Sequence, residues 1–200
     1  MTKRKSNRTA EHHYMVVFAS QPPSNRPRFA HAFASFLTAP APNDPTDVPI
    51  VPDTPISWLP STKVIRPFTR PQPGTNFDMA TTIEWALRNK RTRVSAWGPF
   101  RIKRPLYESA LRRAAEVSAN YSYQAVDRDF RRPNVTNCIH ALSDLDLFSG
   151  PLHTNWARGE RASRMVVDRF TPWIINPDET YRWVVDALGL SAYAIRFREI

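Results

Sequence analysis

The stretch that decides the fold reads YMVVFASQPPSNRPRFAHAFASFL and spans residues 14–37. Its first seven residues are rich in β-branched and aromatic side chains, a composition that favours a buried strand. A proline-rich turn follows over residues 21–27, and residues 28–37 then alternate aromatic and small side chains. The sequence therefore predicts two strands that pair antiparallel across the turn.

Beyond these strands the pattern alternates between short helices and short strands, with a surface loop over residues 38–55, which holds six prolines. Helices are predicted near residues 76–87, 105–117, 138–147, 160–170 and 179–188. Further strands are predicted near residues 56–59, 62–65, 94–102, 121–126 and 193–197. The fold class is therefore α+β, with a mostly antiparallel sheet of four to six short strands and helices packed on one side. The predicted core comprises Val16, Val17, Phe18, Phe29, Phe33, Trp58, Trp85, Leu111, Leu142 and Leu145.

The composition supports a folded domain of 200 residues with 42% hydrophobic residues, including 6 Trp, 6 Tyr and 11 Phe. Proline occurs 19 times and glycine 5 times, which favours short elements over a long helical bundle. We expect a basic leader at residues 1–13, a core at residues 14–148, and a C-terminal helical extension packed on that core at residues 149–200.

The chain has a formal net charge of +10, and residues 88–132 alone contribute +8. Such a stretch attracts nucleic acid, anionic lipid or an acidic substrate. One hypothesis is therefore a non-catalytic module that binds nucleic acid or another polyanion. The alternative is a solvated basic surface with no specific ligand. The candidate binding residues are Arg91, Arg93, Lys103, Arg104, Arg112 and Arg113.

Several classes of protein are disfavoured by what the sequence lacks. No apolar run approaches the roughly 20 residues of a membrane span. The basic start is not followed by the apolar core of a secretory signal, so we expect a cytoplasmic protein. The five glycines never cluster into a phosphate-binding loop, and the histidines lack metal-ligand spacing. We therefore expect neither a cofactor nor a metal site.

The single cysteine, Cys138, excludes an intramolecular disulfide and follows two residues suited to capping a helix, Thr136 and Asn137. The spacing places the thiol in the first turn of that helix. Unpaired N–H groups and the positive end of the helix dipole lie there, and both can lower the pKa of a thiol. The alternative is a small buried residue with no chemistry.

A possible base for this thiol is His31, which shares a strand face with Phe29 and Phe33. An ionisable ring on such a face is either a core histidine bonded to a backbone carbonyl or a functional group. A thiol at a helix start facing an imidazole on a sheet is the arrangement that a nucleophilic cysteine requires. The backbone N–H groups at Asn137 and Cys138 would then stabilise an oxyanion.

The order of these residues resembles the circularly permuted papain-like hydrolases. The strand with Ala30-His31-Ala32-Phe33 comes first, and Asn137-Cys138 opens a helix, with 107 positions between histidine and cysteine. That group includes the permuted NlpC-type enzymes and the lecithin retinol acyltransferase-like proteins, in which the sheet histidine precedes the helical cysteine. The resemblance covers residues 14–148 and implies a papain-like core with a meander packed on the cysteine helix.

The resemblance also implies a polar third residue on the strand after the histidine strand. Here the candidates are Ser57 and Ser61, and Ser57 is the expected partner of the imidazole. The implied function is a thiol hydrolase or acyltransferase that acts on an amide or ester bond of a small-molecule or peptide-like substrate, through Cys138 and His31.

Overall fold

The structure is a computed structural model that describes residues 11–23, 29–40, 52–67, 69–88, 91–127, 131–146 and 148–200. The first ten residues of the expected leader and most of the proline-rich segment 38–55 lie outside the described residues. Residues 11–13 belong to the first strand, so the expected end of the leader at residue 13 is wrong. Helices and mostly antiparallel sheets are mixed along the chain, so the α+β class is confirmed. Within the described ranges, no helix has the length and hydropathy needed to cross a bilayer.

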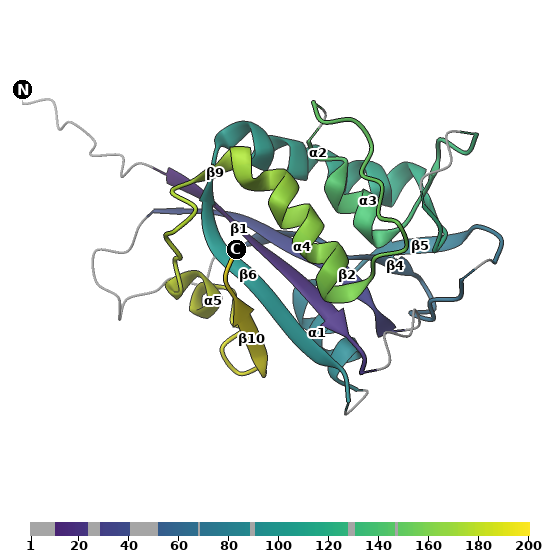
Figure 1. The fold of residues 1–200 in the computed structure, drawn as a ribbon, viewed down its shortest axis with the longest axis horizontal. Coiled ribbons are helices and arrows are strands. Elements are labelled where there is room, and N and C mark those ends of the chain that lie inside the picture. Colours follow the sequence, from purple (N-terminus) through teal and green to yellow (C-terminus); the bar gives the residue numbers. More distant parts are fainter. Residues whose placement is uncertain are drawn as a thin grey trace, which may run out of the picture.

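A six-stranded sheet forms the centre of the molecule (Figure 1). The two strands predicted from residues 14–37 pair antiparallel, with Phe18 opposite Phe33, so this prediction is confirmed. The C-terminal strand β10 instead runs parallel to its neighbour β6. In spatial order the strands are β10 (Ile195–Arg198), β6 (Arg93–Ile102), β1 (Glu11–Gln21), β2 (His31–Pro40) and β3 (Asp53–Ile56), with β9 (Ile174–Ile175) also paired to β6.

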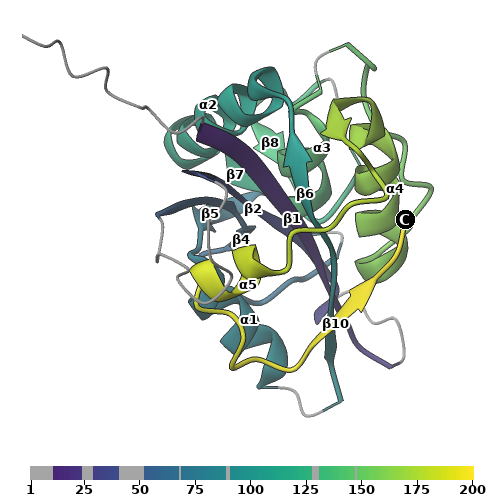
Figure 2. The same cartoon turned by 90° about the vertical axis from the view of Figure 1, so that its left-hand side faces the viewer.

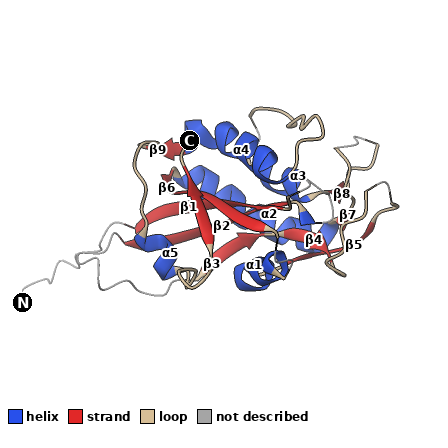
Figure 3. Ribbon diagram, turned by 60° about the horizontal axis from the view of Figure 1, so that its bottom comes forward, coloured by secondary structure: helices blue, strands red, loops and turns tan. Residues whose placement is uncertain are grey.

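A smaller, four-stranded sheet lies at one end of the molecule (Figure 3). Its order is β4 (Trp58–Pro60), β5 (Gln72–Asn76), β7 (Ser122–Tyr123) and β8 (Val135–Thr136). Strand β8 ends one residue before the cap of the helix that carries Cys138. The small sheet therefore fixes the start of that helix.

Helices cover both faces of the large sheet (Figures 1 and 2). On one face lie α2 (Arg104–Asn120), α3 (Cys138–Ser143) and α4 (Gly159–Phe170), and on the other α1 (Met79–Leu87) and α5 (Trp183–Ala187). The expectation of helices on one side only is wrong. Residues 14–21 of β1 are buried without interruption, and a strand with two apolar faces needs cover on both.

Individual elements differ from the sequence prediction in a few places. Residues 62–65 form no strand, whereas the last three residues of the expected loop, 53–55, belong to β3. Of the predicted core residues, Leu111 is 42% exposed and Phe29 is half-buried, and the others are buried. Residues 149–200 contribute the strands β9 and β10 as well as two helices, so they are part of the large sheet.

Candidate functional site

The helix α3 begins at Cys138 and is capped by Asn137. The Asn137 Oδ1 accepts a hydrogen bond from the backbone N–H of His140 at 2.8 Å, and its Nδ2 donates to the carbonyl of Val126 at 2.6 Å. The predicted cap is thereby confirmed. Because first-turn N–H groups have no partner within the helix, the amides of Cys138 and Ile139 remain available to a ligand or to the thiol.

The thiol of Cys138 lies against a narrow cavity of about 70 Å³ and is itself buried. Burial raises its pKa to about 11, although the backbone amides of Ala32, Cys138 and Ile139 act in the opposite direction. The expected lowering of the thiol pKa is therefore wrong, because desolvation outweighs the helix start. The cavity is lined by Ala30, Ile65, Pro67, Tyr123, Ala125, Val126, Asp127, Asn137, Cys138, Ile139, Thr154, Trp156, Ala157 and Arg158.

The imidazole of His31 is completely buried on the α1 side of the sheet. It stacks on Phe33, with ring centroids 5.1 Å apart, and meets the edge of Trp85 at 5.9 Å. Burial lowers the pKa of His31 to about 3. The ring is therefore neutral at any physiological pH, with one protonated and one unprotonated nitrogen.

A chain of hydroxyl groups identifies the protonated nitrogen. His31 Nε2 lies 3.0 Å from Ser57 Oγ, which lies 2.7 Å from Thr82 Oγ1, which in turn lies 2.8 Å from the carbonyl oxygen of Asp78. A carbonyl only accepts, so Thr82 donates to Asp78 and Ser57 donates to Thr82. Ser57 then accepts from Nε2–H of His31. This assignment leaves the lone pair on Nδ1, which is buried and has no hydrogen-bond partner.

The hydrogen bond between His31 and Ser57 is the one expected from the sequence, whereas Ser61 bonds Thr75 instead. Thr82 was not among the candidate residues. A hydroxyl residue on the apolar face of a predicted helix, beside Ile83 and Ala86, is the signal that could have found it, because a buried hydroxyl needs a partner.

The structure does not join Cys138 to His31 by a hydrogen bond. The cavity at the thiol is lined by Ala30 and not by His31. The side chain of His31 faces α1, whereas α3, which carries Cys138, lies on the opposite face of the large sheet. The expected pairing of Cys138 with His31 is therefore wrong, because the sheet separates the two groups.

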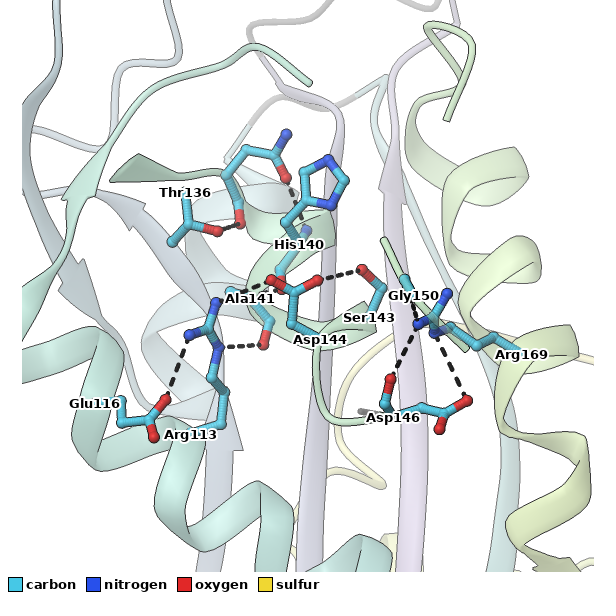
Figure 4. Close-up of polar contacts among 11 residues, drawn as sticks. Arg113, Glu116, Thr136, His140, Ala141, Ser143, Asp144, Asp146, Gly150 and Arg169 are labelled. Atoms are coloured by element: carbon cyan, nitrogen blue, oxygen red, sulfur yellow. Dashed lines mark hydrogen bonds and ion pairs between the residues drawn. The ribbon is translucent and has the colours of Figure 1, made fainter. Parts of the chain in front are cut away.

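On the other face of the sheet, two buried arginines hold α3 and the segment after it (Figure 4). Arg113 forms an ion pair with Asp144 at 3.5 Å and donates to the backbone carbonyls of His140 and Ala141. Arg169 forms an ion pair with Asp146 at 3.9 Å. These contacts fix the helix that carries Cys138 against α2 and α4.

The six candidate residues for polyanion binding do not form one surface. Arg113 is buried, and Arg93 forms an ion pair with Glu160 at 2.8 Å. Lys103 and Arg104 follow the end of β6, whereas Arg91 and Arg93 lie at its start, roughly 30 Å away along a ten-residue strand. The positive charge of residues 88–132 is therefore divided between two ends of the molecule.

No group of three or more His, Cys, Asp or Glu side chains suited to a metal ion occurs within the described ranges. Comparison of the chain with family models, with curated proteins and with solved structures yields no match.

Proposed function

We propose that the protein is a cytoplasmic thiol hydrolase or acyltransferase with a permuted papain-like core, acting on an amide or ester bond. Cys138 is the nucleophile. The observation that carries the proposal is the cavity at the start of α3, which the Cys138 thiol lines beside the backbone amides of Cys138 and Ile139.

The reaction begins with a substrate carbonyl in the cavity at Cys138. As Sγ bonds to the carbonyl carbon, the carbonyl oxygen becomes an oxyanion, which the amides of Cys138 and Ile139 stabilise. The thiol proton passes to the leaving amine or alcohol as the carbon–nitrogen or carbon–oxygen bond breaks. Water or a second acceptor cleaves the resulting thioester.

The resting thiol is uncharged. With its pKa near 11, ionisation before attack is unfavourable at pH 7. The proton therefore leaves the sulfur during attack on the carbonyl.

Acylation by p-nitrophenyl acetate tests the proposal. We expect a burst of p-nitrophenol and one acetyl group on Cys138, located by peptide mass spectrometry. Cys138→Ala removes the nucleophile and should abolish both the burst and the acetylated peptide. His153→Gln, which changes an exposed histidine, is the control and should react like the parent chain.

An unchanged burst in Cys138→Ala, or an unmodified Cys138 in a parent chain whose fold is intact by circular dichroism, would contradict the assignment of the nucleophile. A polyanion-binding surface formed by all six candidate residues together is not favoured, because those residues lie apart.

A further inference from the structure

A pair of aromatic side chains lies on the surface near the end of α4. Phe148 is 87% exposed, and its ring stacks on Trp173 with centroids 6.0 Å apart and planes inclined by 26°. Trp173 belongs to the 3-10 helix Thr171–Trp173, which follows α4. A phenylalanine exposed to this degree loses the hydrophobic contribution of its ring unless something covers it.

The start of α2 continues this surface. Lys103 donates from its backbone to the carbonyl of Trp173 and from Nζ to the carbonyl of Pro172, at 2.9 and 2.8 Å. Leu111, which is 42% exposed, lines an open hollow of about 890 Å³ together with Ile175, two residues after Trp173. Aliphatic and aromatic side chains thus follow one another along this end of the molecule.

Cations surround these apolar groups. Lys103, Arg104 and Arg112 are exposed, and Arg101 lines the same hollow. Glu108 forms an ion pair with Arg104 at 2.7 Å, and Glu11 is the other acidic residue of the hollow, so cations remain in excess.

We propose that this end of the molecule binds the surface of a bilayer containing anionic lipid. We call the surface the aromatic–basic face, formed by Lys103, Arg104, Leu111, Arg112, Phe148 and Trp173. Aromatic and aliphatic side chains enter the interfacial region of a bilayer while lysine and arginine contact the anionic headgroups. Nucleic acid fits less well, because Leu111 cannot stack on a base and Phe148 and Trp173 already stack on each other.

Co-sedimentation of the full chain with vesicles tests the proposal. Vesicles of phosphatidylcholine are compared with vesicles that also contain phosphatidylglycerol, at low and moderate salt. We expect binding to the anionic vesicles, decreasing with salt. Arg112→Glu should lower the partition coefficient at least about tenfold, since each basic residue near the membrane contributes about fivefold. Phe148→Ser should lower it about tenfold through the lost insertion of the ring.

Two matched variants separate the aromatic–basic face from net charge and general hydrophobicity. Arg196→Glu makes the same charge change on β10, which pairs with the start of β6 and not with its end. Ile200→Ser removes another exposed apolar side chain, one that is 40% exposed. Both should bind like the parent chain. Equal losses in Arg112→Glu and Arg196→Glu would overturn the proposal. So would salt-sensitive binding of duplex DNA that requires Arg112 and displaces the vesicles.

Discussion

The two layers that cover the large sheet are held by different chemistry. On the α1 side, His31, Ser57 and Thr82 form an uncharged chain of hydrogen bonds that ends at a backbone carbonyl. On the opposite side, ion pairs of Arg113 and Arg169 hold α3 and the segment after it. The comparison indicates a division of roles: charged pairs fix the position of the cysteine helix, and the neutral chain fixes the proton of the imidazole.

The largest effect is expected from breaking the charged layer. Arg169→Met leaves the carboxylate of Asp146, whose side chain is 3% exposed, without its cation. Loss of one partner of a buried pair costs about 3–5 kcal/mol, because the remaining charge stays buried. Urea denaturation measures the loss. In the matched control Arg164→Met, on the same helix, the exposed pair with Asp168 is removed at a cost below about 1 kcal/mol. Similar losses in both variants would contradict a structural role for the buried pair.

A smaller effect on stability is expected when the pH is lowered, because the neutral layer contains the uncharged ring of His31. The unfolded chain protonates His31 near pH 6.5, whereas the folded chain keeps the ring neutral down to pH about 3. Unfolding therefore takes up a proton below pH 6.5, and the free energy of unfolding decreases as the pH falls. Hydrogen bonds from Arg93, Ser95 and Arg198 lower the pKa of Glu160 to about 2. Glu160 therefore changes the free energy of unfolding only below pH about 4.5.

Between pH 7 and pH 5 the contribution of His31 amounts to about 2 kcal/mol. Denaturation of the parent chain and of His31→Gln at both pH values measures it, and the variant should lose about 2 kcal/mol less than the parent chain. His153→Gln should follow the parent chain. A His31→Gln variant with the full pH dependence would show that the imidazole is not held neutral.

The smallest effect on stability is expected at the middle of the neutral chain. Ser57→Ala removes the acceptor of Nε2–H and the donor to Thr82, which costs about 1.5 kcal/mol. Urea denaturation measures the loss. Ser61→Ala, which removes the exposed contact with Thr75, should leave the stability unchanged. Equal losses in the two variants would contradict a structural role for the hydroxyl chain.

Much of the fold could be predicted because it follows from local patterns of apolar, turn-forming and helix-capping residues in the sequence. The strand pair of residues 14–37 follows from its apolar run and proline turn, and the cap of α3 follows from Asn137. The contact of His31 with Ser57 was also expected. The first two features depend on residues close in sequence, and the contact of His31 with Ser57 joins two neighbouring segments of the chain.

Other features depend on tertiary contacts that no local pattern contains. Leu111 follows Ala110 by one residue, and a helix turns about 100° per residue, so Ala110 faces the core while Leu111 reaches solvent. Arg113 is buried because Asp144 and two carbonyls receive its guanidinium from another helix. The pKa of Cys138 likewise depends on how completely the folded chain excludes water from the sulfur.

The parallel pairing of β10 with β6 bears on how the chain folds while it is being made. Residues 94–97 of β6 pair with residues 195–198, about 100 positions later in the sequence. A ribosome adds roughly 5–20 residues per second, so this edge of β6 waits on the order of 5–20 s for its partner. During that interval its unpaired N–H and C=O groups can pair with another nascent chain. Chaperone dependence and aggregation during expression should therefore respond to substitutions in residues 195–198 more strongly than the stability of the finished fold does.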